Sequence, residues 1–316
     1  GNTALANTAV PALEFQRFDG RRERFATDAL PRARPLFSPR LGFNWDVRGD
    51  RATQIRGGTG IFSGRPPFVW ISNQVGNNGI LTGFIEDNNV TNRPFNTDPL
   101  RFVPTNVTGA PAASYELNFA DRNFVFPQQW RSNLAVDQRL PWGLLGTAEV
   151  IYGRDVNGAF YYDANLRNPT GFFAGPDGRP RWDGNFRINN NITRALVLTN
   201  QNVGYNYNIA FSLEKSFTNG FFAKAAYSYG DACNTIDPGS TANGTFTGVQ
   251  VPGNPNNAPL SRSNFAPGHR SFLALSYRRE YFRFGATQFS LFANRATINY
   301  LSYTTSGDLN GDGVAN

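Results

Sequence analysis

The sequence lacks the residues and runs that mark several common classes of protein. It has no methionine and a single cysteine, Cys233, so no disulfide and no cysteine-based metal site can form within the chain. Charged residues occupy 17% of the positions, below the roughly 25% that is usual for soluble domains. No stretch approaches the ~18 consecutive apolar residues of a membrane-crossing helix. These absences exclude a disulfide scaffold and a helical membrane protein.

Aromatic residues and glycine are abundant instead. Aromatic residues reach 14%, and there are 32 glycines and 20 prolines. The mean hydropathy of −0.42 is compatible with a transmembrane β-barrel, because a barrel strand needs only one apolar face of ~10 residues. Composition alone favours a soluble β-sandwich or propeller equally.

The positive charge comes almost entirely from arginine. The net charge is +7, and lysine occurs only at Lys215 and Lys224. The arginines are scattered, apart from clusters at 21–24 and 32–34, and no nucleic-acid-binding motif accompanies them. We therefore expect solvated loop and lumen charges, and no nucleic-acid partner. Contact of arginines with acidic headgroups or with an anionic solute at the membrane surface stays open.

Period-two alternation of apolar and polar side chains predicts eight strands in four pairs. In the clearest strand, at 203–217, an apolar residue stands at almost every second position, and Asn219-Gly220 then predicts a tight hairpin turn. The predicted pairs are 37–47 with 52–62, 129–140 with 144–154, 203–217 with 221–230, and 270–279 with 284–298.

The connections between strands alternate between short and long. Within each pair the turn is short, whereas about 63–128, 155–202 and 231–268 are long and rich in Asn, Gly, Pro and Thr, and are predicted as loops. Short turns on one side and long loops on the other are typical of outer-membrane barrels. The sequence therefore predicts an all-β protein, an antiparallel up-and-down transmembrane β-barrel of about eight strands. Because Gly1 follows no leader and the chain ends in a turn-rich run, we expect a fragment.

Three stretches resemble a known family. The residues SPRLGFNWDV at 38–47, QIRGGTGIF at 54–62 and PPFVWISNQ at 66–74 resemble the Oar-like TonB-dependent receptors, and GHR at 268–270 and GDLNGDG at 307–313 are also similar to them. The resemblance covers most of 36–316. It implies a partial barrel in that range, with 1–35 as a loop or edge segment. It also implies a parent barrel of about 22 strands, a plug domain absent from this chain, and energy supplied through the TonB complex.

The predicted role is TonB-dependent transport of a large solute across the bacterial outer membrane, with membrane lipid as a partner. One alternative is a passive porin or a small closed barrel, which pairing of 37–47 with 284–298 would favour. Another is a secreted β-rich adhesin, whose outward strand faces would be polar. We expect no enzyme activity, because the single histidine, His269, has no triad spacing and no carboxylate pair suggests acid–base chemistry.

Two groups of residues are candidate sites. Exposed aromatic and amide side chains on external loops suit contact with a solute, although packing of the loops on themselves explains them as well. These candidates are Phe68, Trp70, Asn73, Gln74 and Trp182, with Phe172 and Phe173 nearby in the sequence.

The second group matches part of a calcium-binding loop. Asp308, Asn310 and Asp312 stand at the first, third and fifth positions of such a loop, and Gly313 at the sixth. The ligand expected at the twelfth position would fall beyond Asn316. Calcium is therefore a possible cofactor, and a loop held by its own side-chain hydrogen bonds is the alternative.

Overall fold

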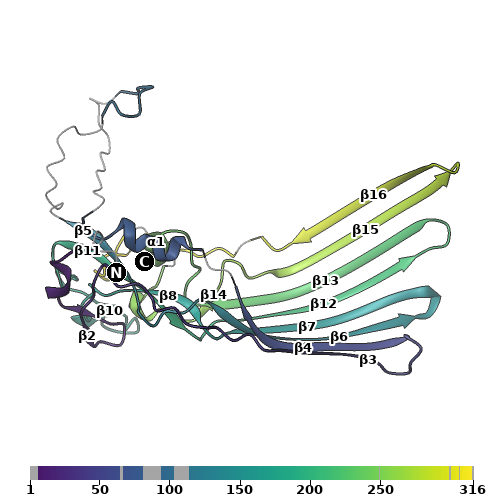
Figure 1. Ribbon diagram of the computed structural model, residues 1–316, viewed down its shortest axis with the longest axis horizontal. Coiled ribbons are helices and arrows are strands. Elements are labelled where there is room, and N and C mark those ends of the chain that lie inside the picture. Colours follow the sequence, from purple (N-terminus) through teal and green to yellow (C-terminus); the bar gives the residue numbers. More distant parts are fainter. Residues whose placement is uncertain are drawn as a thin grey trace.

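Long antiparallel strands form one open, twisted sheet, and the connections at one end of it fold into a separate unit (Figure 1). The computed structural model describes residues 6–64, 67–80, 94–102, 114–248, 250–298, 300–305 and 307–314. None of the helices in those ranges has the length and apolar character needed to cross a membrane.

The large sheet confirms the eight predicted strands. In spatial order they are β16 (Gly285–Ala296), β15 (Gly268–Tyr281), β13 (Phe221–Asn234), β12 (Tyr205–Ser216), β7 (Leu144–Asp155), β6 (Gln128–Leu140), β4 (Thr53–Ser63) and β3 (Arg40–Asp46). All neighbours are antiparallel, and the short β14 (Ser261–Arg262) also pairs with β13. Most observed bounds lie within two residues of the predicted ones, and β13 runs on to Asn234.

Local chemistry explains the tight turns. Between β3 and β4 the Asp46 carboxylate accepts the amides of Gly49 and Arg51 at 3.0 and 2.9 Å, and η3 (Pro141–Gly143) joins β6 to β7. Gly220, between β12 and β13, has a φ of 85°, and a Cβ atom there would meet the carbonyl of Arg278, so the position requires glycine. All four tight turns lie at the same end of the sheet (Figure 1), as predicted.

The sheet has one apolar and one polar face. Strand register places Phe211 between Ala148 and Tyr227, and Leu275 between Ala223 and Leu291. The apolar face includes Leu41, Phe43, Trp45, Ile55, Leu134, Val136, Val150, Ile209, Phe211, Leu213, Leu273, Leu275, Tyr277, Phe289 and Leu291. Phe211 is 54% exposed and Phe289 71%. Such a large exposed apolar face suits contact with lipid.

The opposite face carries charges that pair across strands. Arg56 lies 2.9 Å from Asp137 and 3.6 Å from Glu149, and Lys224 lies 2.9 Å from Glu214. Charged groups on this face and apolar groups on the other match the lumen and lipid sides of a barrel wall.

The outer strands of the sheet are β3 and β16, and within the described ranges they do not pair with each other. The closed eight-stranded barrel that we considered as an alternative is therefore not formed.

The long connections join the strands as predicted, but they contain regular structure that the sequence analysis missed. They contain a second sheet of β5 (Tyr115–Ala120), β11 (Ile192–Gln201) and β8 (Gly158–Asp163), in which β11 pairs parallel to β5 and antiparallel to β8. We call this second sheet and the segments packed on it the loop unit. Residues 196–198 of β11 are fully buried, so both faces of this strand are covered. Alternation is absent in such a strand, which explains why it was missed.

The remaining elements complete the loop unit. Val10 and Phe15, from the predicted 1–35 segment, are buried in its core, and β1 and β2 lie in this unit, away from the tight turns (Figure 1). These elements are η2 (Val10–Ala12), β1 (Phe15–Gln16), β2 (Arg22–Glu23), α1 (Val69–Gly76), β9 (Gly171–Phe172), β10 (Pro180–Arg181), α2 (Ala242–Gly248) and η4 (Pro255–Asn257).

Candidate functional site

The predicted solute-contacting residues all lie in the loop unit, and α1 carries three of them. The Trp70 indole donates to the carbonyl of Gly239 at 2.8 Å, and the Asn73 amide donates to the carbonyl of Ser240 at 3.0 Å. These two bonds tie α1 to the connection between β13 and β15, far away in the sequence. Phe68, at the start of the helix, is 60% exposed.

Gln74 is a buried link between three segments. Its side-chain nitrogen donates to the carbonyls of Thr27 and Ala29 at 2.7 and 3.0 Å, and its oxygen accepts from the Ala120 amide at 3.0 Å. Only 2% of the residue is exposed. In this conformation Gln74 holds the loop unit together and is not open to a solute.

Trp182 is also buried, and its contacts involve different segments. Its indole donates to the carbonyl of Arg167 at 2.8 Å, and its backbone amide donates to the carbonyl of Asn310 at 2.7 Å. Phe172 is 67% exposed, whereas Phe173 lies within 6 Å of the guanidinium groups of Arg179 and Arg181, at 5.8 and 5.7 Å. Contact of these residues with a solute stays a prediction.

The predicted calcium loop is held by its own hydrogen bonds. The Asp308 carboxylate accepts the amides of Gly311, Asp312 and Gly313 at 2.7, 3.1 and 2.7 Å. The Asp312 carboxylate accepts from the Asn310 side chain at 3.0 Å and from the Val314 amide at 2.7 Å. No cluster of three or more His, Cys, Asp or Glu side chains suited to a metal is found in the described ranges. The alternative interpretation accounts for this geometry, and calcium binding stays an untested prediction.

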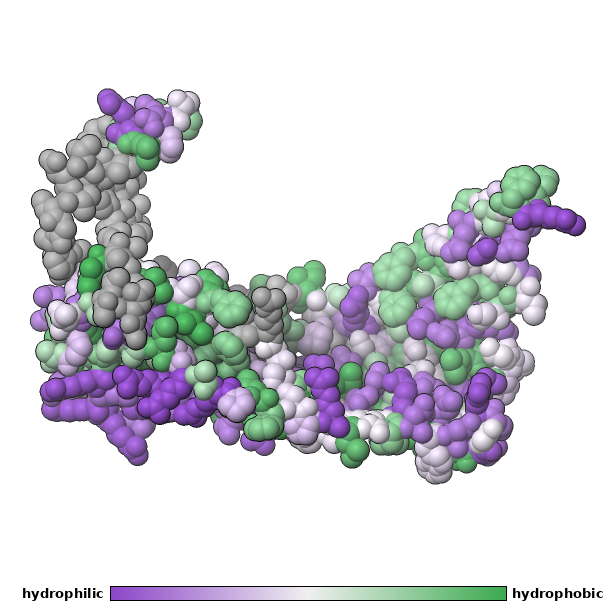
Figure 2. Space-filling model, in the orientation of Figure 1, coloured by the Kyte–Doolittle hydropathy of each residue, from purple (hydrophilic) through white to green (hydrophobic). Residues whose placement is uncertain are grey.

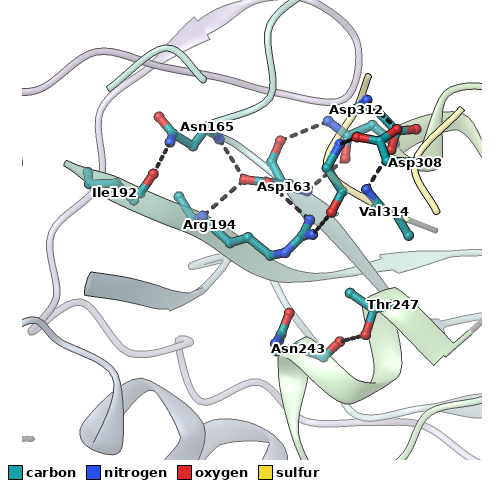
Figure 3. A network of polar contacts seen from close by, with 12 residues as sticks. Asp163, Asn165, Ile192, Arg194, Asn243, Thr247, Asp308, Asp312 and Val314 are labelled. Atoms are coloured by element: carbon teal, nitrogen blue, oxygen red, sulfur yellow. Dashed lines mark hydrogen bonds and ion pairs between the residues drawn. The ribbon is translucent and has the colours of Figure 1, made fainter. Parts of the chain in front are cut away.

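A buried polar network connects this C-terminal loop to the second sheet (Figure 3). Asp163, at the end of β8, accepts the amides of Asn165 and Ala195, each at 2.9 Å. The Arg194 guanidinium lies 3.8 Å from the Asp163 carboxylate and also donates to the carbonyl of Gly313. Arg194 therefore links β8 and β11 to residues more than a hundred positions later.

Asn165 extends the network. Its side chain donates to the carbonyls of Asn189 and Ile192 at 3.1 and 2.7 Å and accepts from the Asn189 amide at 2.8 Å. The backbone of Asp163 both donates to and accepts from the Asn256 side chain, at 2.7 and 2.8 Å. Sequence analysis missed this network because its members lie far apart in the chain. The run of apolar and aromatic residues at 159–162, directly before Asp163, was the sequence feature that could have indicated a buried strand ending at this carboxylate.

Burial raises the pKa of two carboxyl groups in the network. The pKa of Asp163 is raised by desolvation, which outweighs the opposing effects of the Ala195 and Asn165 amides and of Arg194. Desolvation raises the pKa of Asp312 to about 6, against hydrogen bonds from Val314 and Asn310 that lower it.

We expect the C-terminal loop to be more stable at pH 5 than at pH 7. Since the pKa of folded Asp312, about 6, exceeds the ~3.9 of an unfolded aspartate, the folded state binds more protons between these values, and stability falls as the pH rises through 6. Urea unfolding of the loop unit, followed by tryptophan fluorescence at both pH values, measures this effect. Asp312→Asn should reduce the pH difference, and an unchanged difference would contradict the assignment to Asp312.

The fold and these sites define the class of protein. A sheet with an exposed apolar side, a polar side with paired charges and tight turns at one end has the features of the wall of a transmembrane β-barrel. The chain matches the outer membrane beta barrel domain family over residues 13–297 and belongs to it. It is therefore part of a bacterial outer-membrane β-barrel.

Among solved structures, the chain is similar to the outer membrane transporter YddB from Escherichia coli. The identity is 9% and the TM-score 0.42, over 76% of this chain and 26% of that one. The chain thus spans about a quarter of the length of YddB. None of the curated proteins compared with it matches.

Proposed function

We propose that this chain forms barrel wall and external loops of a gated outer-membrane transporter that carries a large solute, by uptake or export, with energy supplied through TonB. The observation that carries the proposal is a polar sheet face that continues into a folded loop unit on the side opposite the tight turns. The polar face suits an aqueous lumen, and an ordered external unit suits recognition of a solute.

The dependence on TonB rests on the resemblance of 38–47, 54–62 and 66–74 to the Oar-like receptors. In this proposal a plug domain elsewhere in the protein contacts the TonB complex, and the apolar sheet face contacts outer-membrane lipid. A passive porin is the second candidate, favoured by the same polar lumen face. The apolar face does not fit a secreted adhesin.

The proposal includes no catalytic role and no nucleic-acid partner. His269 lies in β15, where its Nδ1 atom is 2.7 Å from the Tyr227 hydroxyl and its ring is 4.6 Å from that of Tyr229. These neighbours fit a packed strand residue. The arginines that could attract polyanions occur on several segments and not on one recognition element.

Solute depletion by cells tests the transport proposal. Strains with and without the full-length protein, each with and without a working TonB complex, are given a mixture of large peptides, oligosaccharides and metal chelates. We expect at least one compound to leave the medium only when both the protein and TonB are present, as measured by mass spectrometry. Depletion that needs the protein but not TonB would favour the passive porin. No protein-dependent depletion would contradict transport of these solute classes.

A further inference from the structure

Two hollows on the loop unit meet at Arg32. One, which we call the apolar groove, has a volume of about 380 Å³ and includes Leu30, Leu36, Ile71 and Phe126 in its lining. The other, which we call the basic hollow, has a volume of about 430 Å³. Arg32 lines both, and its backbone amide donates to the carbonyl of Arg122 at 3.1 Å.

The basic hollow has an excess of positive charge. Four arginines and two carboxylates line it. Arg17 lies 3.1 Å from Glu23 and 3.7 Å from Asp121, so both carboxylates already face a cation. The other arginines, Arg24, Arg32 and Arg122, are exposed and form no ion pair within the described ranges. Three guanidinium groups that line one hollow and pair with no carboxylate are suited to bind an anion.

The apolar groove offers a surface of a different kind. Phe124 and Phe126 pack edge to face, with ring centroids 6.3 Å apart, and both line it. Leu30 is 47% exposed on its wall. The groove therefore presents aliphatic and aromatic side chains directly beside the excess positive charge.

We propose that the loop unit binds a soluble anionic amphiphile. Its carboxylate, sulfate or phosphate group lies among Arg24, Arg32 and Arg122, and its apolar body lies in the groove between Leu30 and Phe126. Each hollow has the size of a small-molecule site. A simple anion would fill only the basic hollow. An amphiphile fills both, because its charged group lies in the basic hollow and its apolar body in the groove.

The position of the two hollows favours a soluble molecule over a membrane lipid. They are formed by segments of the loop unit and not by the apolar face of the large sheet, where lipid contacts the protein. Hydrophilic residues cover the side of the loop unit on which β2 lies (Figures 1 and 2). Binding here is independent of transport, so it is measured on purified protein and can fail or succeed separately from uptake.

A fluorescent probe of this chemistry tests the proposal. The full-length protein in phosphatidylcholine nanodiscs is titrated with 8-anilinonaphthalene-1-sulfonate, and protein-free nanodiscs serve as the blank. We expect saturable binding that Arg24→Gln with Arg122→Gln weakens by about tenfold or more, the size of effect for a lost charge-assisted hydrogen bond. The matched control is Arg48→Gln, which changes an exposed arginine at a tight turn and should leave binding unchanged.

The groove is tested in the same way. Leu30→Asp should weaken binding of the sulfonate, whereas Leu260→Asp, at a leucine that is 45% exposed outside the groove, should not. The uncharged N-phenyl-1-naphthylamine should bind with no dependence on the two arginines. If neither the arginine pair nor Leu30→Asp changes sulfonate affinity, the proposal is wrong. If lipopolysaccharide placed in the nanodisc displaced the sulfonate probe, the natural ligand would be a membrane lipid, and the proposal of a soluble ligand would be wrong.

Discussion

Replacing Phe211 by arginine is expected to destabilise the membrane-inserted protein by about 2–4 kcal/mol, the cost of an arginine on the lipid face near the middle of the bilayer. Phe211 lies midway along β12, between Ala148 and Tyr227 on the apolar face. The charged group would have to reach the interface or draw water into the lipid. Urea unfolding of the full-length protein in lipid vesicles measures the loss.

The neighbouring residue provides the control. Ser212 lies between Thr147 and Ala226 on the polar face, so Ser212→Arg places the same charge on the lumen side of the same strand, where water is available. We expect Ser212→Arg to change stability much less than Phe211→Arg. If both variants lost the same free energy of unfolding, the two faces of the sheet would lie in the same environment. That result would contradict the assignment of the apolar face to lipid.

Replacing Asp163 by alanine is expected to unfold the loop unit locally while the large sheet stays folded. The substitution removes the acceptor of the Asn165 and Ala195 amides and leaves Arg194 without its carboxylate. Breaking a buried charge pair costs about 3–5 kcal/mol. Hydrogen exchange measured by mass spectrometry should show faster exchange in β8 and β11 and unchanged exchange in β12 and β13.

An exposed ion pair serves as the comparison for this experiment. Asp177 pairs with Arg179 at the surface of the loop unit, where water solvates both partners, so Asp177→Ala should leave exchange in β8 and β11 unchanged. If Asp163→Ala also left that exchange unchanged, the network would not hold the loop unit together. If it accelerated exchange equally in β12, the loop unit and the sheet would form one cooperative structure.

The membrane sheet could be predicted because its signal is local. Almost every second residue of 203–217 is apolar, so the residues of the strand themselves show which of its faces is apolar. The same holds for the tight turns, since Asn219-Gly220 is a hairpin signal that can be recognised from neighbouring residues alone, and the Asp46 side chain bonds to amides within five positions of it.

The loop unit could not be predicted in this way. Residues 192–201 have no alternation because both faces of β11 are covered, and the parallel pairing of β11 with β5 joins segments separated by a long stretch of chain. Nor does the sequence indicate that Gln74 and Trp182 are buried while Phe68 is exposed, because residues of similar kinds occur in both settings.

The amino-acid sequence was sufficient to determine the class of protein, the eight membrane strands and the side of the sheet that carries the short turns, because a lipid environment imposes a repeating pattern on each strand. The core of the loop unit, the link from Asp163 through Arg194 to Gly313 and the meeting of two hollows at Arg32 became visible only in three dimensions. These features depend on contacts between segments that lie far apart in the chain, and no periodic pattern in the sequence indicates which of these segments come together.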